Sequence, residues 1–146
     1  MPLQGEYEPS PVERERLQVA LYEVTGGRAG NALDDAPVII LTTLGVKSGK
    51  IRKNPLMRVE ANGSYAVVTS NGGATKHPTW YYNIAANPLV ELQDGSVKRD
   101  MKAREVFGAE KEIWWERAEA SYAPFTTYRA KAGRDIPIFV LEPVNE

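Results

Sequence analysis

A short segment rich in Lys and Arg is the first part of the sequence whose residue types suggest chemistry. Residues 45–58 contain five basic side chains and no acidic one: Lys47, Lys50, Arg52, Lys53 and Arg58. Glycines at both ends of residues 45–49 predict a turn, and turn amides with converging basic side chains bind phosphate or carboxylate groups. The segment is not a P-loop, because its spacing is short and Ile follows Lys50 where Ser or Thr is needed. A solvated basic hairpin is the alternative interpretation.

A glycine-containing segment, residues 70–80, is the second candidate site. Gly72 and Gly73 allow the backbone to approach a flat ligand closely. Free amides at the start of the helix predicted next attract anions or ring carbonyls. His77 is the only His of the chain, and a lone His at a helix start is more often a capping or packing residue than a ligand or base. An ordinary strand–loop–helix connection is the alternative here.

Aromatic side chains make the third candidate. Tyr122, Phe125 and Tyr128 fall at helical spacing, roughly on one face, and could wall a pocket for a planar substrate. Core packing is the commoner role of aromatics at such spacing. Acidic side chains give no comparable signal, because Asp34 and Asp35 sit in a predicted loop and no carboxylate pair suggests hydrolysis.

The composition excludes several classes of site. The 146 residues include 18 Lys plus Arg, 19 Asp plus Glu, one His and no Cys, for a formal net charge of −1. Disulfide scaffolds, thiol nucleophiles, thiolate clusters and multi-His metal sites are therefore excluded, and we expect no metal. Chemistry supplied by an organic cofactor remains compatible with this composition. The polar N-terminus is not a signal peptide, so a cytoplasmic location is expected.

The predicted elements begin with a helix over residues 10–25. Ser10 is expected as its N-cap, with an apolar face repeating at helical spacing. Further helices are expected over residues 77–86, 109–121 and 122–131, the second of these with Ile113, Trp114 and Ala118 inward. The apolar face of the first helix consists of Leu17, Ala20, Leu21 and Val24.

Six strands are expected between and after these helices. Asn62-Gly63 and Asp94-Gly95 are strong signals for two-residue hairpins, and Pro55 requires a bulge or an edge position in its strand. The predicted strands are residues 38–43, 51–60, 65–70, 89–93, 97–106 and 136–141.

This order predicts a single α+β domain spanning residues 1–146. Hairpin connections make the sheet mainly antiparallel, and about six strands in so short a chain suggest a split β-barrel with flanking helices. Residues 1–9 are expected to be disordered, residues 10–25 to form the N-terminal helix, and residues 37–143 to form the barrel with its binding site.

Three motifs together resemble the deazaflavin-dependent nitroreductase family, split-barrel reductases that use coenzyme F420. Residues 42–56 (TTLGVKSGKIRKNPL) are similar to the family pattern T-x-G-x-K-S-G-x-x-R-x-x-P-L. Residues 70–88, with SNGG, HPTWYYN and ANP, resemble the second motif, and residues 134–138 (RDIPI) the third. The resemblance covers nearly all of residues 37–143.

The resemblance implies roles for the candidate residues. The coenzyme is a planar deazaflavin with a phosphate and a polyglutamate tail, so a basic hairpin is its physical complement. Lys47, Ser48, Gly49 and Arg52 would hold the phosphate and tail. Pro55 and Met57 would lie along the deazaflavin channel. The ring side would be lined by Thr69, Ser70, Asn71, Gly72, Trp80, Tyr81 and Asn83.

The implied reaction is hydride transfer from the reduced coenzyme, F420H2, to an electron-poor small molecule such as a quinone, an enone or another activated alkene, or a nitroaromatic. Ser70 would bind the acceptor oxygen or the coenzyme, and Tyr122 and Tyr128 would close over the acceptor and donate a proton. Two positions depart from some family members, which have basic residues at the places of Val46 and Asn71. The middle residue of the aromatic trio is Phe125 rather than Tyr, which favours enone or quinone reduction over nitroreduction.

Alternatives from other classes remain at this stage. One is a split-barrel oxidoreductase that uses FMN, whose single phosphate needs fewer basic residues. Another is a non-catalytic carrier of deazaflavin or lipid. We expect no nucleic-acid partner, and the oligomeric state is left open between monomer and homodimer. Weak association with the inner membrane surface is also left open, although Glu13, Glu15 and Glu23 against Arg14 and Arg16 oppose attraction to anionic lipid.

Overall fold

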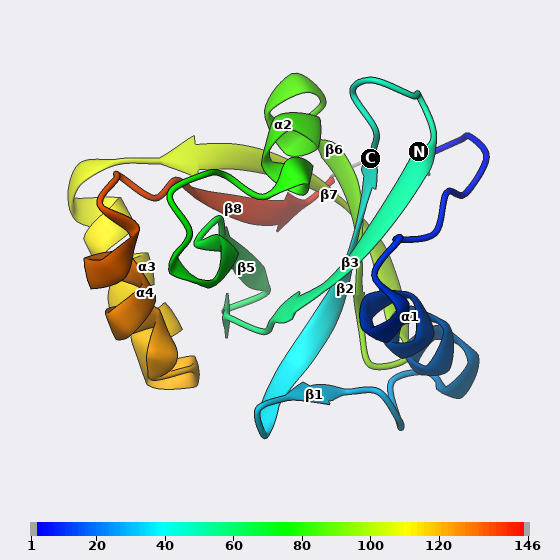
Figure 1. Ribbon diagram of the computed structural model, residues 1–146, viewed down its shortest axis with the longest axis horizontal. Helices are drawn as coiled ribbons and strands as arrows, with labels where there is room; N and C mark the ends of the chain where they lie inside the picture. Colours follow the sequence, from blue (N-terminus) through cyan, green and yellow to red (C-terminus); the bar gives the residue numbers. More distant parts are fainter. Residues whose placement is uncertain (1–2, 145–146) are drawn as a thin grey trace.

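Eight strands form one curled antiparallel sheet in the computed structural model, which describes residues 3–144 (Figure 1). The sheet order is β1-β2-β6-β7-β8-β5-β4, and β3 pairs with β2 over residues 38–44, including the three residues of β2 that also pair with β6. Among the described residues, no helix is long and apolar enough to cross a membrane. The elements are α1 (Glu13–Thr25), β1 (Ala32–Leu33), β2 (Ala36–Leu44), β3 (Ile51–Met57), β4 (Glu60–Ala61), β5 (Ser64–Val68), the short 3-10 helix η1 (Asn71–Gly73), α2 (Thr79–Ala86), β6 (Leu89–Asp94), β7 (Val97–Val106), α3 (Gly108–Ser121), α4 (Pro124–Ala132) and β8 (Ile138–Pro143).

This architecture confirms the predicted α+β split barrel. The two strands beyond the expected six are β1 and β4, each of two residues. Pro55 lies opposite Ile40 in β3, which pairs along its length with β2 alone, so the proline takes the predicted edge position. The only other pairing of β3 among the described residues is a single bridge between Tyr7 and Ile51.

The strand β2 is buried on both faces, as its apolar run predicts. Ile39 and Leu41 enter the cluster inside the barrel, with Trp80 of α2 among its members. Val38 and Ile40 face the other way and pack against α1. A further cluster lies under α3 and α4, which cover the opposite end of the sheet from α1 (Figure 1). The central strand therefore links the helix at one end of the molecule to the barrel interior.

The prediction for the N-terminal helix is wrong in its face. Leu17 is 58% exposed and Val24 is 81% exposed, whereas Val19 and Tyr22 are buried. The Tyr22 hydroxyl donates to the Val38 carbonyl at 3.2 Å and accepts from the Gly95 amide at 2.7 Å. This amphipathic anchor decides which face packs, because an aromatic ring buries a large area while its hydroxyl remains satisfied.

Three further expectations are corrected. Ser10 does not cap the helix by side chain, since α1 begins after Val12; the Ser10 hydroxyl accepts instead from the Val12 amide at 3.1 Å. Ile113 is 48% exposed, and Trp115 takes the buried place beside Trp114. Residues 6–8 are ordered against β3, not disordered, and residues 1 and 2 lie outside the described part.

Candidate active site

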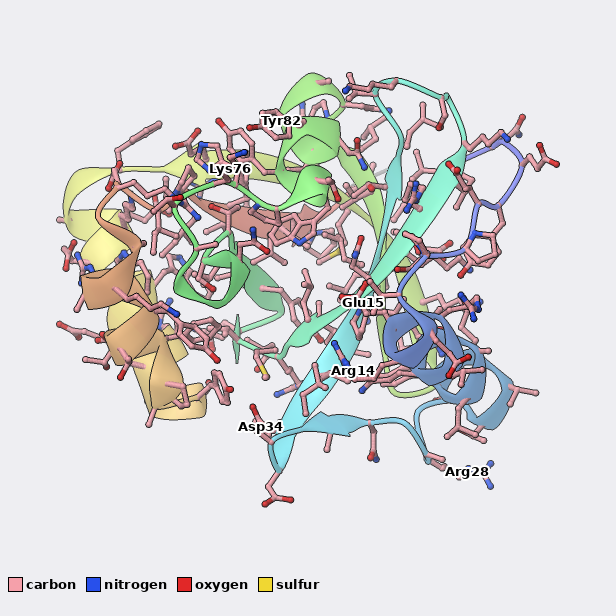
Figure 2. All side chains as sticks on the ribbon, viewed as in Figure 1. Arg14, Glu15, Arg28, Asp34, Lys76 and Tyr82 are labelled. Atoms are coloured by element: carbon pink, nitrogen blue, oxygen red, sulfur yellow. The ribbon has the colours of Figure 1, made fainter. Side chains whose placement is uncertain are left out.

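An open cleft of about 930 Å³ lies between α1, β3, α4 and the loop of residues 69–77, here called the glycine loop. Arg14 and Glu15 at the start of α1 border it on one side, and Asp34, in the turn between β1 and β2, borders it below (Figure 2). The cleft collects residues from all three candidate segments of the sequence. The predicted site residues that line it are Arg52, Pro55, Met57, Ser70, Asn71, Gly72, Trp80, Tyr122, Phe125 and Tyr128.

The tip of the β2–β3 hairpin does not line the cleft. Lys47, Ser48 and Gly49 are exposed there, beyond the strand end that carries Arg52. The Ser48 hydroxyl accepts the Lys50 amide at 3.1 Å, and the Gly49 amide donates to the Gly45 carbonyl at 2.9 Å. Two of these three predicted phosphate-binding residues therefore shape the turn itself.

Asn83 holds this hairpin from α2 and does not line the cleft. It is 9% exposed, accepts the Val46 amide at 3.0 Å and donates to the Thr43 hydroxyl at 3.2 Å. A buried amide that satisfies both partners fixes their relative placement. The structure thus places Asn83 as a support of the hairpin and not as a wall of the cleft.

Arg134 organises the glycine loop, residues 69–77. Its guanidinium donates to the carbonyls of Thr69 at 2.8 Å, Ala74 at 3.1 Å and Lys76 at 3.2 Å. Thr69 is itself buried, and its hydroxyl donates to the Pro137 carbonyl at 2.8 Å. The guanidinium of Arg has five N–H donors in a fixed planar arrangement, so one Arg can hold several carbonyls at once. Thr69 therefore contributes to the anchor of the loop and lies behind the cleft surface.

His77 lies in the cleft wall with its tautomer determined by Arg134. The Arg134 guanidinium lies 3.1 Å from Nδ1, and a guanidinium only donates, so Nδ1 accepts and the ring proton is on Nε2. Burial and the charge of Arg134 lower the pKa of His77. Tyr81 stacks on the imidazole with ring centroids 4.0 Å apart, so this predicted ring-side residue packs behind His77.

The aromatic trio forms the wall opposite the hairpin. The Phe125 ring meets Tyr122 and Tyr128 edge-on, at centroid distances of 5.2 and 6.1 Å. The Tyr122 hydroxyl donates to Asp34 Oδ2 at 2.7 Å and lies 3.2 Å from the Tyr128 hydroxyl. These two hydrogen bonds, with burial, raise the pKa of Tyr122 above its ordinary value. Both functions predicted from the sequence, pocket wall and core packing, apply to Tyr122 and Phe125.

The N-terminal segment lies along the basic hairpin. The Ile51 amide donates to the Glu6 carbonyl at 2.8 Å, and the Glu8 amide donates to the Ile51 carbonyl at 2.9 Å. Tyr7 lies under the Lys53 ammonium, with 5.2 Å from Nζ to the ring centroid. This short stretch therefore adds an edge to β3 where the sequence predicted disorder.

Acidic side chains from outside residues 45–58 pair with the basic side chains inside them. The segment has no acid in sequence, yet in space most of its charge is matched. Within residues 3–144, Lys47 alone of the five has no ion-pair partner. The pairs are Lys50–Glu6 at 3.8 Å, Arg52–Glu8 at 3.1 Å, Lys53–Glu23, Arg58–Asp94 at 2.9 Å and Arg58–Glu60 at 3.9 Å.

Comparison with known proteins decides the family. Residues 14–143 match the family described as F420H(2)-dependent quinone reductase. An F420H(2)-dependent quinone reductase of Mycobacterium tuberculosis is 32% identical over 130 residues, which cover 86% of this chain and 87% of that protein. The chain belongs to the F420H(2)-dependent quinone reductase family.

Two solved structures agree with this assignment. One, described as an F420-H2 dependent reductase (FDR-A), is 51% identical, with a TM-score of 0.69 over 73% of this chain and 94% of that chain. Another, described as a domain-swapped dimer, is 46% identical, with a TM-score of 0.72 over 91% of this chain and 100% of that chain. The predicted resemblance and the F420-dependent oxidoreductase class are confirmed, and FMN is not needed as the cofactor.

The cleft of this F420H(2)-dependent quinone reductase family member fits the coenzyme by its own geometry. Gly72 has a φ of 66°, and a Cβ added there would meet no atom within 4 Å, so the loop backbone faces open space. Pro55 and Met57 offer an apolar wall, and Arg52 offers charge at the hairpin side. A planar ring would fit against the loop backbone and the apolar wall, and an anionic extension of that ring would fit beside Arg52.

Sequence reasoning missed three polar residues of the site in this family member. In the sequence, Asp34 is an ordinary loop carboxylate, His77 is a residue at a helix start, and Arg134 stands out only as part of a motif. The partners of each lie far away in the sequence, 88 residues for Asp34 and Tyr122 and 57 for Arg134 and His77. The sequence signal available for Arg134 was the third motif itself, whereas Asp34 had none.

Proposed function

We propose that the cleft binds reduced F420 and directs its hydride to a quinone. The observation that carries this proposal is that one cleft is lined by Arg52, by the loop backbone at Asn71 and Gly72, and by the wall of Tyr122, Phe125 and Tyr128. The first attracts anionic groups, the second offers amides to a ring edge, and the third offers a flat apolar face with hydroxyls.

The coenzyme end of the site is assigned to the hairpin and the glycine loop. Arg52, continued outward by Lys47 and the Ser48 hydroxyl, would hold the phosphate and the carboxylates of the tail. Gly49, where an added Cβ would meet no atom within 4 Å, would leave room for these groups beside the turn. Backbone amides of the loop would bind ring carbonyls and stabilise negative charge on the ring. Thr69, Tyr81 and Asn83 would act by positioning these surfaces, because their contacts lie behind the cleft.

The acceptor end is assigned to the aromatic wall. When bound, the reduced coenzyme supplies the hydride. The Tyr122 proton is committed to Asp34, since a carboxylate only accepts, so the Tyr122 oxygen accepts from Tyr128. Tyr128 can exchange that 3.2 Å bond for one to the acceptor oxygen. We therefore assign proton donation to Tyr128 and the orientation of Tyr128 to Tyr122, with Ser70 as a second contact to the acceptor or the coenzyme.

The test is anaerobic oxidation of reduced F420 by menadione, followed by the return of the visible absorbance of the oxidised coenzyme. We expect turnover that requires the protein, and a coenzyme Kd raised about tenfold by Arg52→Gln. Lys98→Gln removes the same charge from the exposed face of β7 and should leave the Kd unchanged. Tight binding of F420 without turnover of menadione, an enone or a nitroimidazole would instead establish a carrier.

A further inference from the structure

The negative charge of Asp34 has no role in the proposed reaction. Its carboxylate borders the cleft beside Tyr122 and Tyr128, where a hydride acceptor would lie. No Lys, Arg or His within residues 3–144 forms an ion pair with it, and its one side-chain partner there is the neutral Tyr122 hydroxyl. Glu15, the other carboxylate of the cleft wall, differs because Arg14 lies 3.8 Å away and Ser10 donates to it.

Asp34 lies at the first position of a tight turn. Asp34 and Asp35 have φ values of 49° and 64° and form the two-residue turn between Leu33 and Ala36, which face each other across the hairpin. Asn and Asp are both favoured at the first position of such a turn. Asn at position 34 would therefore keep the turn and remove only the charge of the side chain.

Arg52 and Asp34 lie apart in the cleft wall, whereas Arg14 and Glu15, also in the wall, form a pair 3.8 Å apart. The guanidinium of Arg52 lies on the hairpin side, and the unpaired carboxylate of Asp34 lies at the aromatic wall. The Tyr122 hydroxyl proton is held by Asp34, so it brings no positive charge to this end. An anionic group is favoured at the first end and repelled at the second.

We propose that Asp34 is a specificity-determining residue that makes the acceptor end of the cleft select uncharged acceptors over anionic ones. This inference rests on the proposed function, since it assumes that the hydride acceptor binds at the aromatic wall. It also gives the bound coenzyme a direction, because the polyanionic tail is repelled from the end where the acceptor must enter.

The experiment compares two acceptors that differ in one charge, 1,4-naphthoquinone and 1,4-naphthoquinone-2-sulfonate, at low ionic strength. In Asp34→Asn the ratio of kcat/KM for the sulfonate to that for the neutral quinone should rise about fivefold. Asp35→Asn makes the same change in the same turn, away from Tyr122, and should move the ratio less than twofold. Tyr122→Phe removes the hydrogen bond but keeps the charge, so the preference for the neutral quinone should persist.

A binding measurement separates this inference from the proposed function. Quenching of tryptophan fluorescence reports sulfonate binding to the protein with oxidised F420, because Trp80 lines the cleft and no turnover is needed. Asp34→Asn should tighten this binding about fivefold, and added salt should tighten it in the unsubstituted protein. An unchanged binding constant and an unchanged kcat/KM ratio in Asp34→Asn would overturn the role of Asp34. Absence of turnover by the unsubstituted protein would overturn the proposed function instead.

Discussion

The carboxylate of Glu8 lies 3.1 Å from the guanidinium of Arg52, the one basic hairpin residue that lines the cleft. Backbone hydrogen bonds on either side of Ile51 hold the segment that carries Glu8 against β3. Any carboxylate of a coenzyme tail that reaches Arg52 therefore meets a carboxylate of the protein already there. The Glu8 carboxylate thus occupies the position at Arg52 that a carboxylate of the coenzyme tail is expected to take.

Glu8→Gln should consequently strengthen coenzyme binding. The pair is partly exposed, and such pairs contribute about 0.2–1 kcal/mol, so we expect the Kd of F420 to fall about threefold at low salt, as measured by coenzyme fluorescence. Glu116→Gln, an exposed change of the same charge on α3, is the control. The deazaflavin riboside without phosphate and tail should show no gain, and weaker binding of F420 to Glu8→Gln would refute the competition.

Asn83→Ala should loosen the β2–β3 hairpin. Two buried contacts, to the Thr43 hydroxyl and the Val46 amide, lose their partner. Leaving such groups unsatisfied costs about 1–3 kcal/mol, so the free energy of unfolding should fall by about 2 kcal/mol in urea, and F420 should bind more weakly. Asn31→Ala removes an exposed amide that lies before β1, away from the hairpin, and should change neither quantity beyond about 0.5 kcal/mol. Equal effects of the two changes would contradict the support role of Asn83.

Local signals made most of the fold predictable. Asn62-Gly63 forms the expected hairpin turn, and the apolar run of β2 is buried on both faces. The second hairpin forms one residue later than predicted, because Asp94 still pairs with Val97 and Gly95 and Ser96 make the turn. The face of α1 was not predictable from the periodicity of Leu17, Leu21 and Val24. The orientation of α1 depends on Tyr22, whose hydroxyl forms hydrogen bonds with Val38 and Gly95. The sequence of the helix alone does not show that these partners will be there.

The candidate site is likewise only partly predictable from the sequence. Arg52, the glycine loop and the aromatic trio carried motifs and could be predicted to meet. Asp34 could not, because its place is created by a turn 88 residues away from Tyr122. The matching of the hairpin charge could not be predicted either, because the acids that pair with it come from residues 6–8, α1, β4 and β6. Ion pairs between residues far apart in the sequence produce no periodic pattern, so they cannot be predicted from the sequence alone.

Arg134→Gln should loosen the glycine loop and raise the pKa of His77. Burial is the larger cause that lowers this pKa and would remain, while the charge of Arg134 would be lost. Because the chain has a single His, its imidazole resonances can be followed without ambiguity by NMR over a pH titration. Arg99→Gln, an exposed change of the same charge, should leave the titration unchanged.

The same pair predicts the direction of a pH effect on stability. The folded-state pKa of His77 lies below its ordinary value of 6.5, so below that pH the unfolded chain takes up the proton more readily. The His77 contribution to the free energy of unfolding is therefore complete above about pH 6.5 and decreases as the pH falls through the folded-state pKa. Arg134→Gln should flatten this decrease in urea denaturation series. An unchanged slope with an unchanged His77 titration would show that the guanidinium does not act on the ring.

Phe125→Tyr should change acceptor preference. Phe125 is 5% exposed, lines the cleft and lies edge-on to both Tyr122 and Tyr128, so Tyr at this position would add a third hydroxyl to the acceptor wall. The resemblance links a middle Tyr with nitroreduction, because a further donor can bind the oxygens of a nitro group. We expect the rate with a nitroimidazole to rise relative to a quinone and an enone, by about threefold or more. Phe107→Tyr adds the same atom at a 66% exposed position and should leave all three rates as they are. The same three rates in Phe125→Tyr as in the unsubstituted protein would show that acceptor choice is set elsewhere in the cleft.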